Sequence, residues 1–207
     1  MKIAIVTWHS IVYKELADIT LPNKKYYCQR HGYDLRYVFD EERKLRGWDR
    51  IRMVFVLLPE YDAVMWMDCD AVFTNHAIPI ESLLTPETNF VCATDINGLN
   101  TGTFIAVNKP ITAQFLYVVM TAGPSLTRGH HWGEQEAMIR LLTGPPYENF
   151  ATIVPQNAMN SYINAEQGWP ATFDGNWREG DWIMHMAGIP LERKLPLAAE
   201  YGARAIL

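Results

Sequence analysis

One short run constrains the fold of this chain most: Val64-Met65-Trp66-Met67-Asp68-Cys69-Asp70, an apolar stretch that ends in two aspartates. A short, uninterrupted apolar run is typical of a strand buried on both faces. Because side chains alternate along a strand, Asp68 and Asp70 are expected to point the same way, and Cys69 the other way as a small buried residue. Ligands bind at the carboxyl ends of such strands, where paired carboxylates commonly hold a divalent cation and, through it, a phosphate.

Strand-like and helix-like segments alternate through the first half of the chain, and the second half is more irregular. The pattern predicts strands over residues 3–8, 34–39, 89–94, 102–107, 152–154 and 182–186, and helices over 22–31, 50–58, 110–121, 134–142 and from 191 onward. Pro22 suits a first helical turn, Asn108 suits the cap before residue 110, and the Gly- and His-rich segment 123–133 is expected to be a loop. This alternation is typical of an α/β protein whose mostly parallel sheet carries helices on both faces.

Composition excludes several classes of protein. The formal net charge of −5 argues against a nucleic-acid interface. Three cysteines without paired spacing argue against a disulfide framework or a zinc ribbon. No apolar run reaches membrane-spanning length and no signal peptide is recognisable, so the sequence predicts a soluble, cytoplasmic protein without an integral membrane segment. The Rossmann glycine fingerprint, the phosphate loop and the Gly-x-Ser-x-Gly elbow are all missing from the sequence.

His185 is a further candidate ligand, at the end of the predicted strand over 182–186. A lone histidine is more often a core residue, but two carboxylates and one imidazole suit Mn²⁺ or a similar ion with open positions for diphosphate oxygens. Gly188 would let the backbone approach a phosphate closely. Lys194 could reach a phosphate, although a solvated basic face explains it equally well.

Other polar residues suit a sugar. Asn100 can bond sugar hydroxyls through donors and acceptors, or simply belong to a turn. Glu134 and Gln135 begin a predicted helix, where they either lie beside a reacting sugar carbon or complement the helix dipole. Trp132 and Trp169 lie in predicted loops and are candidates for stacking on a sugar, although most tryptophans are packing residues.

Together these segments resemble glycosyltransferase family 34, which includes yeast galactosyl- and mannosyltransferases and plant xyloglucan xylosyltransferases. The D-x-D segment with its Trp-Met prefix and the G-D-x-x-x-H-x-A-G segment at 180–188 are the specific parts of the resemblance. The matching stretches are residues 48–50, 65–74, 100–104, 134–135, 154–156, 160–162 and 180–188.

The resemblance implies an α/β GT-A fold, a Rossmann-like, mostly parallel mixed sheet within a single domain over residues 1–207. A nucleotide-binding half would cover about 1–95, a donor-sugar and acceptor half about 96–190, and a C-terminal tail 191–207. The implied activity is metal-dependent, retaining transfer of a hexose or pentose to a glycan or other hydroxyl acceptor. The donor would be a nucleotide-diphosphate sugar, a UDP-sugar in preference to a GDP-sugar, and the cofactor Mn²⁺ or alternatively Mg²⁺.

The resemblance also implies roles for individual residues. Asp68, Asp70 and His185 would hold the metal, and Glu134 with Gln135 would form the catalytic pair at the reaction centre. Donor contacts are expected from Thr7, Trp8, Arg50, Asp68, Asn100, Gly188 and Lys194. Gly133 stands where some family members carry a further acidic residue, so the identity of the acceptor does not carry over.

Three alternatives remain open at this point. A transferase of the glycogenin-like family 8 shares the D-x-D, Asn-x-Gly and late-histidine layout. A catalytically silent module could have kept the sheet and bind a nucleotide or carbohydrate. A metal-dependent nucleotidyltransferase would also need paired carboxylates at a strand end.

Overall fold

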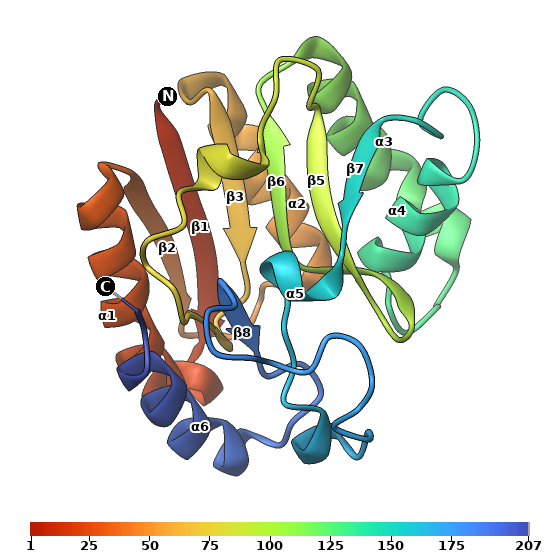
Figure 1. The fold of residues 1–207 in the computed structure, drawn as a ribbon. Coiled ribbons are helices and arrows are strands. Elements are labelled where there is room, and N and C mark those ends of the chain that lie inside the picture. Colours follow the sequence, from red (N-terminus) through yellow and green to blue (C-terminus); the bar gives the residue numbers. More distant parts are fainter. Residues whose placement is uncertain (207) are drawn as a thin grey trace.

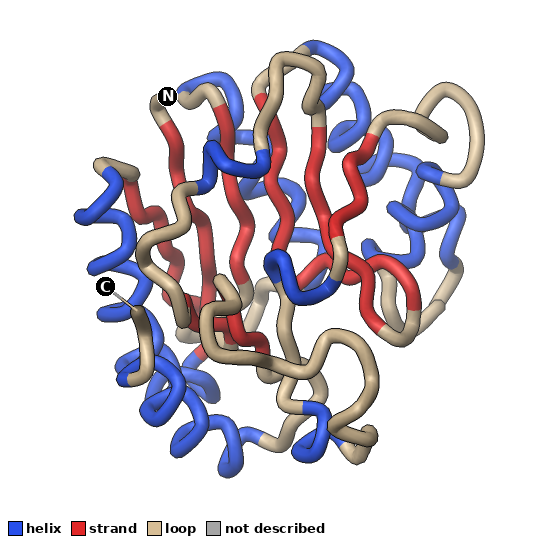
Figure 2. Tube along the Cα trace, viewed as in Figure 1, coloured by secondary structure: helices blue, strands red, loops and turns tan. Residues whose placement is uncertain are grey.

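The computed structural model describes residues 1–206 and is built around two sheets (Figures 1 and 2). The strands are β1 (Ile3–Ser10), β2 (Asp34–Asp40), β3 (Ala63–Met67), β4 (Ala71–Phe73), β5 (Phe90–Asp95), β6 (Gly98–Val107), β7 (Ala151–Val154) and β8 (Ile183–His185). The helices are α1 (Lys14–His31), α2 (Gly47–Leu57), α3 (Pro110–Thr127), α4 (Glu134–Leu142), α5 (Gln156–Met159) and α6 (Leu191–Ala203). Short 3₁₀ turns are η1 (Ile11–Tyr13), η2 (Leu58–Glu60), η3 (Ile80–Leu83) and η4 (Asn164–Gln167).

The larger sheet is mixed and has the strand order β2-β1-β3-β6-β5-β7. The pairs β1–β2, β1–β3 and β5–β7 are parallel, whereas β6 runs antiparallel to both β3 and β5. The smaller sheet is the antiparallel pair β4–β8. The predicted mostly parallel mixed α/β sheet is therefore confirmed.

Strand side chains alternate between two cores, as a sheet covered on both faces requires. Val64 and Trp66 of β3 pack in one core, which α2, α3 and α4 cover, and these helices lie behind the sheet in Figure 1. Met65 and Met67 pack in the other core, which α1, η3 and the β8 segment cover. A third apolar cluster joins α1 to α6 and to the β4–β8 pair.

The prediction that the first helix begins at Pro22 was wrong. The helix α1 begins at Lys14, directly after β1 and η1, and Pro22 lies in its interior. A proline inside a helix cannot donate to the carbonyl four residues earlier. That carbonyl belongs to Asp18, on the exposed side of α1, where water can replace the missing donor. The buried face formed by Leu16 and Ala17 explains why the helix starts early.

The predicted loop over 123–133 and the predicted Asn108 cap were also wrong in part. Helix α3 continues to Thr127, and Gly123 is buried inside it. A Cβ atom at Gly123 would lie 2.6 Å from Cζ3 of Trp48, so this glycine permits close packing against α2 and does not end the helix. Lys109 is the cap residue, and Asn108 instead donates its Nδ2 to the Tyr61 carbonyl at 3.0 Å.

Three strands differ from the prediction by more than one residue, and the first is β1, which extends to Ser10, two residues past the predicted end. Strand β6 begins at Gly98, four residues before the predicted start at residue 102, and β4 was not predicted at all. Among residues 1–206, no helix is long and apolar enough to cross a bilayer. The predicted halves of the domain and the cytoplasmic location stay predictions.

Candidate active site

The two aspartates lie in the turn between β3 and β4, at the carboxyl end of β3. The Ala71 amide donates to the Asp68 carbonyl at 3.2 Å, so residues 68–70 form a turn and not the end of a strand. Ala71 then pairs with His185 across the β4–β8 ladder. This pairing brings a residue from the end of the chain beside the aspartates.

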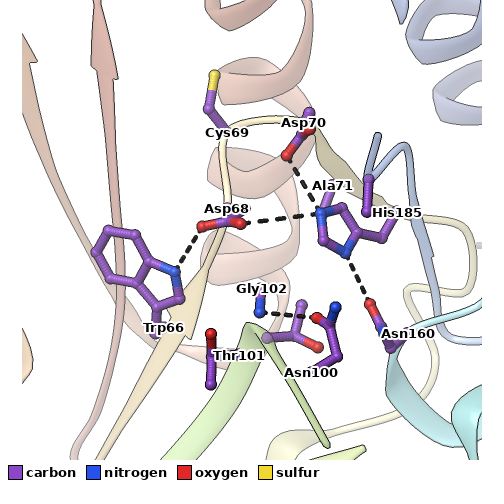
Figure 3. Close-up of polar contacts among 12 residues, drawn as sticks. Trp66, Asp68, Cys69, Asp70, Ala71, Asn100, Thr101, Gly102, Asn160 and His185 are labelled. Atoms are coloured by element: carbon purple, nitrogen blue, oxygen red, sulfur yellow. Dashed lines mark hydrogen bonds and ion pairs between the residues drawn. The ribbon is translucent and has the colours of Figure 1, made fainter. Parts of the chain in front are cut away.

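The three predicted metal ligands meet at this turn (Figure 3). The Nε2 atom of His185 lies 3.3 Å from Asp70 Oδ1 and 3.9 Å from Asp68 Oδ2. All three ligand atoms lie within 4.8 Å of one another. The Cys69 side chain points away from His185 in Figure 3, with its Sγ 4.0 Å from Thr20 Oγ1. The strand-based expectation for these side chains therefore describes their directions correctly, even though the backbone turns.

Asn160 orients the imidazole of His185. Its Oδ1 lies 2.7 Å from His185 Nδ1, and both residues are buried. An amide oxygen only accepts hydrogen bonds, so Nδ1 carries a proton and Nε2 faces the carboxylates. This is the arrangement in which an imidazole ligates a metal while its other nitrogen is fixed by a protein acceptor.

Removing the Asn160 acceptor is expected to weaken Mn²⁺ binding by about 10–100-fold, because the imidazole loses its orientation. Asn160→Ala tests this, with the Mn²⁺ dissociation constant measured by electron paramagnetic resonance. Asn160→Asp is the matched variant: it keeps an acceptor oxygen, and the Nδ2 atom that it removes has no hydrogen-bond partner. Affinity equal to that of the unmodified protein in Asn160→Ala would contradict the assigned role.

Gly102 forms the surface on which this ligand cluster rests. Its amide donates to Asn100 Oδ1 at 2.8 Å, and its carbonyl accepts from the Asp68 amide at 2.8 Å. A Cβ atom at Gly102 would overlap Cε1 of His185. The imidazole therefore lies directly against the backbone of β6, which only a glycine allows.

Trp66 and Arg50 hold the Asp68 carboxylate from the side away from His185. Trp66 Nε1 donates to Asp68 Oδ1 at 2.8 Å, and Arg50 Nη1 lies 3.3 Å from the same oxygen. Arg50 Nη1 also donates to the Thr101 carbonyl at 3.2 Å. Arg50 Nε lies 3.3 Å from Glu134 Oε1, an ion pair in which the N–H is not aligned for a hydrogen bond. Arg50 thus links the metal side of the site to Glu134.

The predicted catalytic pair, Glu134 and Gln135, begins α4. Burial raises the pKa of Glu134, and the nearby Arg50 guanidinium opposes this only in part. The Glu134 carboxylate lies against Gly47 at the start of α2, where a Cβ atom would overlap it. Gln135 Oε1 accepts from the Thr101 amide at 3.1 Å and from the Thr101 hydroxyl at 3.3 Å. Gln135 is therefore fixed to β6, and Glu134 lies against α2.

Lys194 reaches the site from α6. Its Nζ donates to Asp70 Oδ2 at 2.5 Å. Burial by itself raises the pKa of Asp70, but His185 and Lys194 outweigh it and hold that pKa well below its ordinary value. Asp70 is therefore charged throughout the physiological range.

A second lysine, Lys24 of α1, lies beneath the turn, and sequence inspection missed it. It is fully buried, and its Nζ donates to the carbonyls of Ala71 at 2.6 Å and Cys69 at 3.4 Å. Within residues 1–206 it forms no ion pair. Burial lowers its pKa to about 8, against the raising effect of Cys69, Asp70 and Asp68. A lysine in a helical segment gives no sequence signal for such a position.

The buried Lys24 predicts a pH dependence of stability. Its pKa is about 8 in the folded protein, against 10.5 for a lysine side chain exposed to water. Between these values the unfolded chain binds more protons, so the contribution of Lys24 to the free energy of unfolding rises with pH and levels off above 10.5. Relative to Lys24→Met, the unmodified protein should gain about 3 kcal/mol across this window. Urea unfolding from pH 7 to 10.5 measures the difference.

The exposed neighbour provides the control for this measurement. Lys25→Met should change the free energy of unfolding by nearly the same amount at every pH, because Lys25 is exposed. The buried cysteines and tyrosines also titrate above pH 8, but all the variants share them. Parallel pH profiles for the unmodified protein and Lys24→Met would contradict the assignment.

The site opens into a cavity of about 590 Å³ at the carboxyl end of β3 and the amino end of the antiparallel β6. Its walls include most of the predicted site residues: Arg50, Asp68, Asp70, Asn100, Glu134, Gln135, His185 and Gly188. Trp8 lines an adjoining cavity of about 190 Å³ together with Arg50 and the aspartates. Thr7 is buried in β1, lines neither cavity, and has no hydrogen-bond partner for its hydroxyl.

A polar network that the sequence did not indicate fixes Asn100. Its Nδ2 donates to Asp95 Oδ2 and to the Tyr162 hydroxyl, each at 2.9 Å. The Tyr162 hydroxyl in turn donates to Asp95 Oδ2 at 2.8 Å. The only sequence signal for Tyr162 is its place in the matching stretch 160–162, and Asp95 had none.

A Rossmann-like sheet with an Asp-x-Asp turn and a late histidine at its carboxyl edge defines a GT-A glycosyltransferase domain. The family model of the galactosyl transferase GMA12/MNN10 family, glycosyltransferase family 34, matches residues 3–88 and 84–195. The chain belongs to this family. The match confirms the predicted family over the glycogenin-like alternative.

Individual relatives are distant. The chain is 22% identical, over 81% of its length, to an uncharacterized alpha-1,2-galactosyltransferase of Schizosaccharomyces pombe, of which it spans 55%. It is 29% identical, over 55% of its length, to galactomannan galactosyltransferase 1 of Cyamopsis tetragonoloba, of which it spans 29%. The chain thus spans about half or less of these two relatives.

Solved structures support the fold. A glycosyltransferase involved in glycosylation of the PBCV-1 major capsid superposes with a TM-score of 0.72 at 17% identity, covering 97% of this chain and 100% of that one. The galactosyltransferase LgtC superposes with a TM-score of 0.60 at 10% identity, covering 95% of both chains.

Proposed function

We propose that this protein transfers a hexose, with retention of configuration, from a UDP-sugar to a hydroxyl of a glycan in a Mn²⁺-dependent reaction. One observation carries the proposal: Asp68, Asp70 and His185 meet within 4.8 Å on the wall of a cavity that Glu134 and Gln135 also line. The residues that would bind the metal and the diphosphate therefore line the same cavity as the residues that would bind the sugar.

The residues present fit a divalent cation. Two carboxylates and an imidazole whose Nε2 faces them are suitable ligands for Mn²⁺ or Mg²⁺ and leave positions for diphosphate oxygens. A cation bound there would neutralise the charge that develops on the diphosphate when the glycosidic bond breaks. Lys194, which pairs with Asp70, would place a further positive charge near the same diphosphate.

The cavities suggest how the donor lies. The nucleotide end would occupy the smaller cavity near Trp8, and the sugar would occupy the larger one beside Glu134 and Gln135. Glu134 is paired with Arg50, which lowers the nucleophilicity of its carboxylate, so we favour a front-face reaction in which the leaving phosphate takes the acceptor proton. The Glu134 carboxylate would then stabilise the oxocarbenium-like transition state by its charge.

The names of the relatives make galactose the first sugar to test, with UDP-galactose as donor. Thermal unfolding with UDP-galactose, UDP-glucose, UDP-xylose and GDP-mannose, each with Mn²⁺, Mg²⁺ or a chelator, is the direct test. The correct donor at 100 times its dissociation constant should stabilise the protein by about 2.7 kcal/mol, and only with a metal present.

Turnover separates the alternatives. Release of UDP from the bound donor would support a transferase, whereas metal-dependent binding without turnover would identify a silent module. Release of pyrophosphate from a nucleoside triphosphate would indicate a nucleotidyltransferase. If none of the donors binds, the proposal is wrong.

A further inference from the structure

A further cavity, which we call the β5–β7 cavity, continues the site along the carboxyl edge of the large sheet. It has a volume of about 700 Å³, within the range of small-molecule binding pockets. It lies beyond the ends of β5 and β7, and its lining includes Thr94, Pro155 and Gln156 from that edge. Asp95 and Ile96 line both this cavity and the 590 Å³ cavity, so the two spaces share a rim.

The three cavities follow the strand order of the sheet. The small cavity lies at the end of β1, the cavity with the metal ligands lies at β3 and β6, and the 700 Å³ cavity lies at β5 and β7. If the nucleotide end of the donor lies at β1, a substrate entering from the opposite end reaches the sugar position across Ile96. The donor would therefore lie toward β1 and the acceptor toward β7 along the edge of the sheet.

Exposed apolar side chains border the passage between the two larger cavities. Ile96, Trp169 and Phe173 are 47%, 39% and 43% exposed. The rings of Trp169 and Phe173 stack with centroids 6.4 Å apart and planes inclined by 23°. Trp169 lines the 590 Å³ cavity, and Phe173 lines the 700 Å³ cavity. Aromatic faces of this kind match the apolar faces of sugar rings.

The β5–β7 cavity is also lined by polar side chains that are available to bind a ligand. Asp174 and Arg178 line it, and within residues 1–206 their side chains form no ion pair or hydrogen bond. Asn157, in contrast, is fully engaged, because its amide bonds Asn176, Asp181 and the Gly175 amide. The cavity thus combines an aromatic wall with free hydrogen-bonding groups, as a carbohydrate site requires.

We infer that the sugar units of the glycan acceptor that are remote from the accepting hydroxyl lie in the β5–β7 cavity, against Phe173. This inference rests on the proposed function, because it takes the reacting sugar to lie beside Glu134. A neutral oligosaccharide fits the cavity better than a second nucleotide, since the metal ligands that would hold a diphosphate line the neighbouring cavity at β3 and β6.

The length of the acceptor is the variable to test. Glucose, galactose and mannose, and the di-, tri- and tetrasaccharides built from each, are compared as acceptors with the donor that the protein hydrolyses. In at least one series, kcat/KM should rise from the mono- to the trisaccharide. Equal kcat/KM at every length, or donor hydrolysis without transfer to any member of the panel, would overturn the inference. Failure to hydrolyse any donor would instead count against the proposed function.

A substitution separates the remote cavity from the reaction centre. Phe173→Ala should lower kcat/KM for the trisaccharide about three- to tenfold through lost aromatic contact, and should leave the monosaccharide and donor hydrolysis unchanged. The control is Tyr117→Ala, which removes an aromatic ring that is 55% exposed on α3, and all these rates should stay unchanged in it. An equal loss for mono- and trisaccharide in Phe173→Ala would contradict the inference.

Discussion

Replacing Asp70 by asparagine is expected to lower sugar transfer at least about 100-fold, because it removes a charged ligand and not merely its support. The Asp70 carboxylate faces His185 Nε2 at 3.3 Å and accepts from Lys194 at 2.5 Å. Without its charge, the ammonium groups of Lys194 and Lys24 lie buried near the turn with less compensation. The variant should therefore bind Mn²⁺ weakly and unfold more easily. Donor hydrolysis across a Mn²⁺ titration measures the first effect, and urea unfolding the second.

Asp18→Asn is the matched control for this change. Asp18 is exposed on α1 and pairs with Lys14, a surface ion pair worth at most about 1 kcal/mol. Its loss should leave both the Mn²⁺ dependence and the rate unchanged. Normal activity in Asp70→Asn at limiting Mn²⁺ would remove Asp70 from the ligand set.

Gly102→Ala is expected to produce the second large effect. The added methyl group would overlap the His185 ring, so either the imidazole or β6 must move. Overpacking of this kind costs about 1–3 kcal/mol, and the displaced imidazole should weaken Mn²⁺ binding by about 10–100-fold. Electron paramagnetic resonance of Mn²⁺ and thermal unfolding measure the two consequences separately.

Gly144→Ala makes the same chemical change at a site with free space. A Cβ atom there would meet no atom within 4 Å. The substitution should leave Mn²⁺ binding unchanged and alter stability only slightly, through the unfolded chain. If Gly102→Ala binds Mn²⁺ as tightly as Gly144→Ala, close contact between His185 and β6 is not needed for the ligand geometry.

The part of the site that sequence inspection predicted depends on local chain geometry. The apolar run before Asp68 required a buried strand, and its end had to lie at the carboxyl edge of the sheet. His185 could be named because it ends a strand-like segment and fits a family pattern. What brings it to the aspartates is the β4–β8 ladder. Strand β4 has only three residues and falls below the length at which an alternating pattern can be recognised.

The supporting roles of Asn160 and Lys24 could not be predicted, because each acts through a tertiary contact. Asn160 reaches His185 across 25 positions of sequence, and Lys24 reaches Ala71 across 47. The local sequence around Asn160 looks like that of an ordinary turn, and the sequence around Lys24 looks like that of an exposed helix face. The prediction for Gly123 was wrong for a different reason. The composition of segment 123–133 predicts a loop, but Gly123 lies within a helix, where its packing against Trp48 requires a glycine.

The β4–β8 pair also has a consequence for the order in which the protein is made. Every strand of the six-stranded sheet lies within residues 3–154, so a growing chain carries the whole scaffold once β7 has left the ribosome. His185 and Lys194 are synthesised at least 30 residues later. The centre that we assign to cation binding is therefore completed after the main sheet, and a nascent chain can form that sheet before it can hold the ion.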